Sequence, residues 1–379
     1  MKYVSSSFSI LLSSLNSLVL GLSFTSFNFI DTKSSSLFSS SSIFSYKFLS
    51  SLAVSNIFLG GLLFFIFNNI RNEKRLIILS TLCTLIGYLF ILIYPSVYCI
   101  LFSRIIIGLG CGCTCYVVPQ YIFKLASEDS KGLWCSLHPI NLNLGILLGQ
   151  SLVYFNTVSM YYIPYISICL FLMILCFLQI FLVDIPTQDG EVSLRNLFTN
   201  KRSFKSILVV TLLHISQHFS GIDYISIYLP NILNNEYIKI LLVYSITIPS
   251  VILSSLLLNK YGRKYLYLIS ALICCLGSVI LVKYKYTGVI LFLVGYNVGL
   301  SNVPWVVPNE ASPPEFVAPI TKLIIMSNWA SAYFILILMK YVHMKYNDLG
   351  FYLYSILMGF MVIFTILFVP ETKNNKEFL

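Results

Sequence analysis

The chain is 379 residues long and too apolar for a soluble protein of this size: 58% of its residues are hydrophobic, its mean hydropathy is +0.86, and only 10% are charged. Soluble domains carry about 25% charged residues, so this sequence lacks the polar surface that a water-soluble fold needs. The formal net charge of +10 does not indicate a nucleic-acid partner, because the basic residues lie in short clusters between long apolar runs. We therefore expect a membrane protein whose main solvent is the lipid bilayer.

The apolar runs are long enough to cross a bilayer as helices, which takes about 20 residues each. Helices are expected because lipid offers the backbone no hydrogen-bond partner, whereas a β-barrel would show short segments of alternating polarity. The first run lacks the strongly basic start and the cleavage site of a signal peptide, so we interpret it as a span. The predicted fold class is an all-α membrane protein with about twelve transmembrane helices, near residues 8–30, 46–68, 76–95, 97–122, 134–156, 161–183, 205–231, 239–258, 264–283, 287–307, 320–341 and 350–369.

The basic residues between the spans predict the orientation of the chain. Most of the 24 lysines and arginines fall on one side of the predicted membrane, and Arg104 lies inside a span. The positive-inside rule then places both termini in the cytoplasm. We expect a multi-pass protein of the plasma membrane.

The spans form two groups of six around a polar, basic stretch. This predicts an N-terminal bundle at 1–186, a short cytoplasmic linker at 187–204 and a C-terminal bundle at 205–379. The groups resemble each other weakly, since the sixth span ends LVDIPT and the twelfth ends FVPETK. Parallel six-helix repeats are the layout of major-facilitator transporters, in which the substrate site lies between the halves near the midplane.

The fourth predicted span combines a charge with several glycines. It reads RIIIGLGCGCTCYVVPQYI over Arg104–Ile122. The glycines would let neighbouring helices approach closely. Arg104 must be paired or solvated because its surroundings are apolar; packing with a snorkelling arginine is the simpler alternative.

Two further spans carry polar side chains where packing alone does not require them. The fifth, Gly132–Gln150, ends in Gln150, whose amide offers both a donor and an acceptor. The seventh carries QHFSGIDYISIY over Gln217–Tyr228, with His218 and Asp223 inside an apolar run. Polar residues this dense within a span indicate a functional cavity. For Gln150, an interhelical hydrogen bond is the alternative.

The tenth and eleventh spans add an aromatic ring and more amides. The tenth reads GLSNVPW over Gly299–Trp305, preceded by Asn297 and followed by Glu310. The eleventh contains Asn328. An indole ring can cover an apolar face of a ligand while amides bond its polar groups. An interfacial aromatic belt is the alternative for the tryptophans.

Together with the loop NKYGRK at Asn259–Lys264 and the sequence PETK at Pro370–Lys373, these motifs resemble the sugar porter family of the major facilitator superfamily, which includes the facilitative glucose transporters. The order and spacing of the motifs cover nearly the whole chain. The resemblance implies two sets of site residues. Substrate binding is expected at Gln150, Gln217, His218, Asp223, Thr247, Asn297, Trp305 and Asn328, and a gating or cytoplasmic charge network at Arg104, Arg263, Lys264, Glu310 and Glu371.

The sequence also departs from the family pattern. Lys124 stands where the family has a glutamate, which we expect to weaken the cytoplasmic ion-pair network. His218 and Asp223 replace a glutamine and an asparagine, and Asn297 replaces the glutamate of many glucose transporters. These three replacements keep hydrogen-bonding side chains in place.

The resemblance implies transport of a hexose, with glucose the first choice, by alternating access and facilitated diffusion. A proton-coupled symporter is the alternative: the first span has Ser23 where proton-coupled relatives carry an aspartate, but Asp223 beside His218 is a rival proton site. A non-transporting sugar sensor is an alternative of another class, although the short tail after the last span argues against it. A decayed transporter is a further one.

An enzyme is not expected, since no nucleophile with a base, no phosphate-binding loop and no metal set is found. Cys111, Cys113 and Cys115 lie on different faces of a helix, with no acid or histidine to complete a zinc site. We expect no cofactor and no metal. The expected partners are a small-molecule sugar and the lipid bilayer, with no nucleic acid; the sequence does not fix the oligomeric state.

Overall fold

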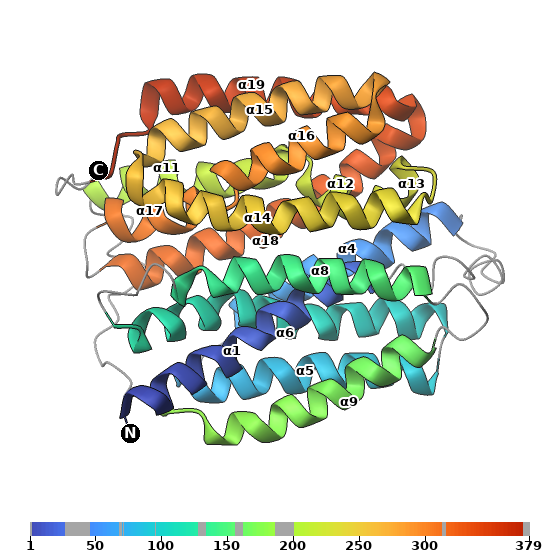
Figure 1. Cartoon of the computed structure of the whole chain (residues 1–379), viewed down its shortest axis with the longest axis vertical. Helices are drawn as coiled ribbons and strands as arrows, with labels where there is room; N and C mark the ends of the chain where they lie inside the picture. Colours follow the sequence, from blue (N-terminus) through green and yellow to red (C-terminus); the bar gives the residue numbers. More distant parts are fainter. Residues whose placement is uncertain are drawn as a thin grey trace. The chain divides into compact units, whose positions relative to one another are not determined.

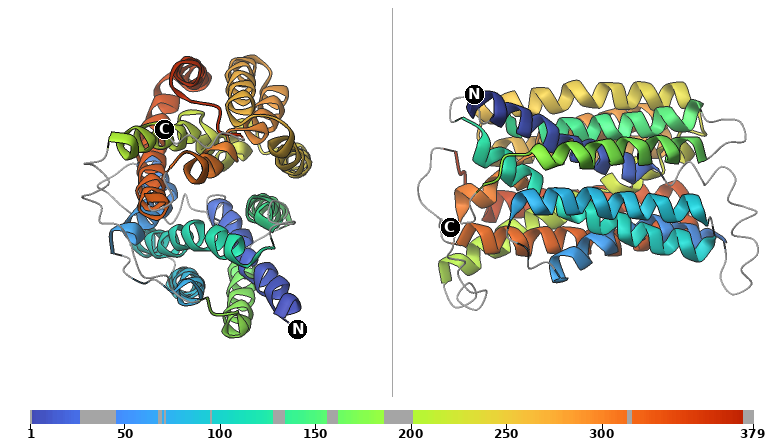
Figure 2. Two further views of the ribbon diagram at one scale, coloured as in Figure 1. Left: turned by 90° about the vertical axis from the view of Figure 1, so that its left-hand side faces the viewer. Right: turned by 90° about the horizontal axis from the view of Figure 1, so that it is seen from below.

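The computed structural model describes residues 2–26, 46–67, 70, 72–94, 96–127, 134–155, 162–185, 201–312 and 316–373, and in these ranges the regular secondary structure is helical. This confirms the all-α fold class. The chain divides into two compact units, Met1–Gln188 and Asp189–Leu379. Figure 1 shows their helices from the side, and Figure 2 shows them end-on and from below. Most of the predicted linker lies outside the described residues.

The first unit contains a helix for each of the first six predicted spans. These are α1 (Lys2–Thr25), α4 (Tyr46–Phe67), α5 (Glu73–Ile93), α6 (Val97–Leu125), α8 (Leu137–Phe155) and α9 (Tyr162–Leu178), which continues as the 3-10 turn η2 (Gln179–Phe181). Helix α6 packs against α4 and α5, α1 packs against α8, and α5 packs against α9.

The second unit covers the other six predicted spans, two of which are interrupted. Its helices are α11 (Lys201–Phe219), α12 (Ile222–Ile227), α13 (Leu229–Ile232), α14 (Tyr237–Lys260), α15 (Arg263–Lys283), α16 (Lys285–Val298), α17 (Val303–Ala311), α18 (Val317–Tyr346), the 3-10 turn η4 (Asn347–Leu349) and α19 (Gly350–Phe368). Helix α15 packs against α16 and α19, and α11 packs against α18. In the described part of the chain, eight segments are long and apolar enough to cross a membrane.

Glycine determines where the seventh predicted span breaks. Gly221 has φ +91°, a left-handed conformation that residues with a Cβ rarely adopt, and it separates α11 from α12. A Cβ at this position would also press on the ring of Tyr354. The tenth span breaks at Gly299–Asn302, and α17 restarts with Pro304 in its first turn, where a missing N–H costs nothing. These breaks lie within the polar motifs identified in the sequence.

Glycines also let helices of the first unit touch backbone to backbone. A Cβ at Gly60 of α4 would overlap the carbonyl oxygen of Ile105, and a Cβ at Gly108 of α6 would overlap that of Ile57. The α4–α6 crossing is therefore built on reciprocal glycine contacts, as is common where helices pack in lipid. This agrees with the prediction that the glycines of the fourth span allow close approach.

Many polar side chains are buried in the structure, and many large apolar side chains are exposed. Serine, asparagine and glutamine side chains are buried, among them Asn16, Ser80 and Gln179, whereas large apolar side chains such as Phe177 and Leu367 are exposed. Asn16, Ser80, Thr81 and Gln179 are hydrogen-bonded to one another inside the first unit. Exposed apolar and buried, bonded polar groups are the arrangement that a bilayer stabilises.

The glycine contact predicts a selective loss of stability. We expect Gly108→Ala to destabilise the first unit by about 1–3 kcal/mol, because the added methyl group has no room beside the Ile57 carbonyl. Gly359→Ala on α19 is the matched control, since a Cβ there meets nothing within 4 Å. Thermal unfolding of the detergent-purified proteins measures the difference; equal melting temperatures for the two variants would contradict this packing.

Candidate functional site

A buried group of amides lies around the end of α11 in the second unit. The Nε2 of Gln217 donates to the backbone oxygen of Leu300, 2.8 Å away, in the break between α16 and α17. The Nδ2 of Asn328 on α18 donates to Gln217 Oε1 (3.0 Å) and to the backbone oxygen of His214 (3.2 Å). Gln217 and Asn328 were both predicted to bind substrate, and the structure brings them together.

The next pair bridges the Gly221 break. Nδ1 of His218 donates to Oδ2 of Asp223 at 2.6 Å, so the last turn of α11 is tied to the first turn of α12. His218 is 7% exposed, and its Nε2 is buried with no hydrogen-bond partner among the described residues. The pairing of these two predicted residues leaves a ring nitrogen available for another partner.

Trp305 is positioned by a histidine that the sequence analysis missed. Nε2 of His214 donates to the backbone oxygen of Pro304 at 2.7 Å, and its ring meets the Trp305 ring edge-on, with 4.7 Å between centroids. His214 is fully buried, whereas Trp305 is half-buried. The signal was present in the sequence, because His214 precedes Gln217 and His218 by three and four residues and so shares their helix face.

The predicted residues Asn297 and Thr247 form a separate contact between α16 and α14. Nδ2 of Asn297 donates to Ser250 Oγ (2.9 Å) and to the backbone oxygen of Thr247 (3.4 Å). The hydroxyl of Thr247 donates to the backbone oxygen of Tyr244 in its own helix. In this structure the Asn297 side chain therefore joins α16 to α14, whereas the Thr247 side chain is bonded within α14.

Gln150 lies on α8 in the first unit and has a different environment. It is 1% exposed, and neither its Oε1 nor its Nε2 has a hydrogen-bond partner among the described residues. Among the described residues, Gln150 therefore has no interhelical hydrogen bond. A buried polar group without a partner costs about 1–3 kcal/mol, so a ligand that bonds this amide would recover that cost.

Arg104 is also in the first unit, where its guanidinium donates to two backbone oxygens and one hydroxyl, while its Nη2 has no hydrogen-bond partner among the described residues. Its Nε donates to Ala53 O (3.1 Å) and its Nη1 to Ser23 O (2.8 Å) and Ser26 Oγ (3.2 Å). The side chain is 1% exposed. These bonds join α6 to α1 and α4, so Arg104 acts here through interhelical hydrogen bonds. The other residues of its predicted charge network lie in the second unit.

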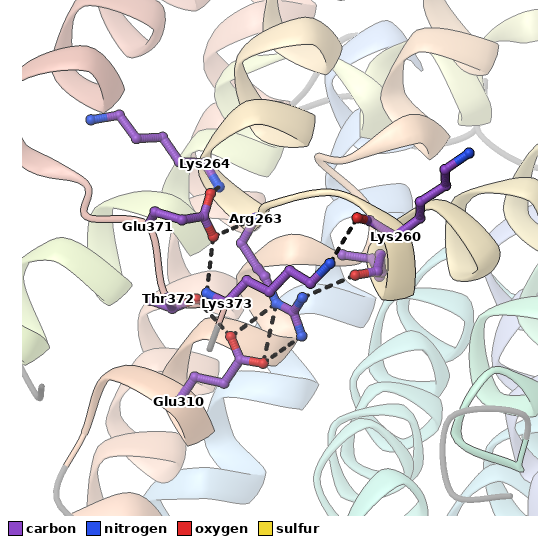
Figure 3. Close-up of polar contacts among 8 residues, drawn as sticks. Lys260, Arg263, Lys264, Glu310, Glu371, Thr372 and Lys373 are labelled. Atoms are coloured by element: carbon purple, nitrogen blue, oxygen red, sulfur yellow. Dashed lines mark hydrogen bonds and ion pairs between the residues drawn. The ribbon is translucent and has the colours of Figure 1, made fainter. Parts of the chain in front are cut away.

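Three other members of the predicted charge network, Arg263, Glu310 and Glu371, meet at one end of the second unit (Figure 3), whereas the ammonium group of Lys264 donates to the backbone oxygen of Ile366. Arg263 and Glu310 form a paired contact, with Nε to Oε2 at 3.0 Å and Nη2 to Oε1 at 2.6 Å. Glu371 accepts from the backbone N–H groups of Arg263 (2.8 Å) and Lys264 (3.2 Å), and so caps the start of α15. Thr372 donates to Glu310 Oε2 at 2.6 Å. A carboxylate at a helix N-terminus is favourable because the backbone dipole is positive there.

The first unit has an ion pair that corrects one expectation. Lys124, which replaces the glutamate expected in the family, was predicted to weaken the network; instead its Nζ bonds to Oε1 of Glu73. Next to it, Nδ2 of Asn72 donates to Oδ1 of Asp184 at 2.8 Å. The substitution thus changes the sign of the charge and leaves a pair in place.

The geometry of these residues agrees with the similarity of the chain to known proteins. A family model described as "Sugar (and other) transporter" matches residues 13–187 and again 185–377, which is nearly the whole chain and each half separately. The chain belongs to the sugar porter family of the major facilitator superfamily.

The relatives of this sugar porter are also named as sugar or glucose transporters. The chain is 25% identical over 395 residues to the solute carrier family 2 facilitated glucose transporter member 2 of Sus scrofa, covering 86% of the chain and 75% of the relative. It is 21% identical over 353 residues to the putative sugar transporter ERD6-like 13 of Arabidopsis thaliana, covering 76% and 71%. Among solved structures, the xylose transporter XylE from E. coli matches with a TM-score of 0.82 at 19% identity, covering 97% of each chain. That likeness confirms the major-facilitator fold.

The Arg104 contacts give a prediction for stability. Arg104→Ala removes the donor from buried oxygens of Ser23 and Ala53, and each buried group that loses its partner costs about 1–3 kcal/mol. We expect a lower melting temperature and less folded protein by size-exclusion chromatography. Arg75→Ala is the matched control, because Arg75 is exposed on the same unit. An unchanged melting temperature in Arg104→Ala would contradict the role of these bonds.

Proposed function

We propose that this sugar porter carries a hexose, with glucose as the first candidate, by alternating access and facilitated diffusion. The observation that carries the proposal is the similarity to a facilitated glucose transporter over 86% of the chain. Sugar moves down its gradient, and the protein supplies a site that is open to each side in turn. The protein has no role as an enzyme in this proposal, and it acts in the plasma membrane with both termini in the cytoplasm.

The side chains suit a polyhydroxyl ligand. Gln150, Gln217 and Asn328 have amides, which both donate and accept and so match hydroxyl groups, which do the same. Trp305, held by His214, offers an apolar ring for the C–H face of the sugar.

The surroundings of Arg104 favour facilitated diffusion over proton coupling. Ser23, at the position of an aspartate in proton-coupled relatives, contributes its backbone oxygen to Arg104, and its hydroxyl is bonded to Val19 O within α1. A serine hydroxyl does not carry a proton across the physiological pH range. The first unit therefore lacks a carboxylate at this place.

Uptake of radiolabelled glucose into a hexose-transport-deficient yeast strain tests the proposal. We expect saturable uptake that other hexoses compete for and that falls at least about tenfold in Gln150→Ala and Asn328→Ala, since losing one ligand hydrogen bond costs ~1.5 kcal/mol or less and the cavity change adds to it.

The control for that assay is Asn143→Ala, which removes an amide from the same helix as Gln150 but one that is bonded to Pro139 O in its own helix. Uptake should stay near that of the parent protein. Absence of uptake of any hexose despite surface expression would overturn the hexose proposal and favour a pentose substrate or a sugar sensor.

The His218–Asp223 pair supports proton symport as a second candidate. A carboxylate and a histidine bonded at 2.6 Å across the break in an apolar span can relay a proton. If the pair carries a proton, sugar addition at acidic external pH evokes an inward current that Asp223→Asn abolishes while sugar binding persists. Sugar uptake without any current at acidic pH would exclude this mechanism.

A further inference from the structure

The Glu73–Lys124 pair joins the ends of neighbouring helices in the first unit. Glu73 is the first residue of α5, and Lys124 lies in the last turn of α6. The carboxylate is nearly buried, with 9% of the Glu73 side chain exposed, compared with 38% for Lys124. Helices α5 and α6 pack against each other along their length, so this ion pair closes one end of a large helix contact.

The second unit has the corresponding pair with the opposite signs. Arg263 is the first residue of α15, and Glu310 lies at the end of α17, which continues the interrupted span begun by α16. Since α5 and α15 are the third spans of their units, and α6 and α16–α17 the fourth, both pairs link the start of a third span to the end of a fourth. Acid and base have changed places between the two units.

A second carboxylate also takes part at the same place in each unit. Asp184 follows the sixth span of the first unit and accepts from Asn72, the N-cap of α5. Glu371 follows the sixth span of the second unit and accepts from the backbone N–H groups that begin α15. The likeness between the units therefore extends to three positions, and only the signs of Glu73 and Lys124 are exchanged.

The helix dipole favours the signs found in the first unit. An acid at a helix N-terminus and a base at a C-terminus are both favourable, so Glu73 and Lys124 each stabilise their own helix as well as each other. Arg263 and Glu310 lie at the unfavourable ends, and there the carboxylate of Glu371 and the hydroxyl of Thr372 supply added partners. The helix dipoles therefore favour the signs of the Glu73–Lys124 pair and oppose those of the Arg263–Glu310 pair.

We propose that Glu73 and Lys124 are positioning residues for transport: they form the charge-reversed counterpart of the Arg263–Glu310 pair and hold the adjoining ends of α5 and α6 in the arrangement that the transport cycle requires. The replacement of the family's glutamate by Lys124 is then compensated, because Lys124 and Glu73 carry opposite charges. The acid that the family resemblance predicted at this position would bring a carboxylate against Glu73 and, nearby, Asp184.

Charge exchange tests the proposal, and the uptake arm rests on the proposed function because it needs a transported sugar. We expect Lys124→Glu to lower the maximal uptake rate per surface transporter at least about tenfold with little change in KM, because it leaves Glu73 facing a like charge in a nearly buried position. Glu73→Lys should do the same. The double exchange should recover most of the rate, since it restores opposite charges at these two positions.

The control is the Lys285–Asp348 pair, which is more exposed, with 36% and 45% of the side chains accessible. Reversing either of its charges should leave the uptake rate and KM unchanged, as exposed pairs contribute little. The melting temperatures of the same variants are measured in detergent without sugar. They therefore distinguish failure of this proposal from failure of the hexose proposal. A double exchange no better than the worse single variant, or a fully active Lys124→Glu, would overturn it.

Discussion

In the hydrocarbon region of a bilayer a polar group has no water to bond with, and the internal structure of this protein follows from that constraint. Arg104 shows it most directly: a guanidinium that no carboxylate pairs with among the described residues is held by backbone oxygens from two other helices. The group formed by Asn16, Thr81 and Gln179 does the same with neutral side chains. These bonds fix which helices are neighbours. The apolar outer surface requires that the backbone form helices, but it does not determine which helices are neighbours.

The same constraint explains why the unpaired groups matter. Both amide atoms of Gln150 and one nitrogen of His218 are buried without a partner among the described residues, as are single atoms of several other side chains, such as Thr211 and Ser278. The helix breaks at Gly221 and Gly299 lie close in sequence to the polar residues of the second unit. A break in a helix leaves backbone N–H and C=O groups without the hydrogen bonds that an intact helix would give them. Such a break is tolerated in a membrane only where other protein groups or a ligand bond to these backbone groups. In this chain Gln217 bonds to Leu300 O in the second break.

The fold was predictable from the sequence because hydropathy and helix length depend on local composition. The order of the spans was confirmed, and the largest differences were at their ends and at the breaks, such as α18, which extends to Tyr346 beyond the predicted 341. The grouping of Gln217 with Asn328 and of Arg263 with Glu310 agreed with the sequence motifs. The partners of Asn297, the position of His214 beside Trp305 and the Glu73–Lys124 pair were not predicted. Each depends on which face of one helix meets another, and a motif read along the chain does not contain that information.

The central claim is that the amides of Gln150 and Asn328 bind a hexose through its hydroxyl groups. Equilibrium binding of radiolabelled D-glucose to the purified protein tests it without requiring transport, with L-glucose as a competitor that has the same composition and opposite handedness. The account predicts saturable binding that D-glucose competes for, L-glucose does not, and either alanine variant weakens at least about tenfold. Binding that is unchanged in both variants, or equal competition by the two enantiomers, would contradict it.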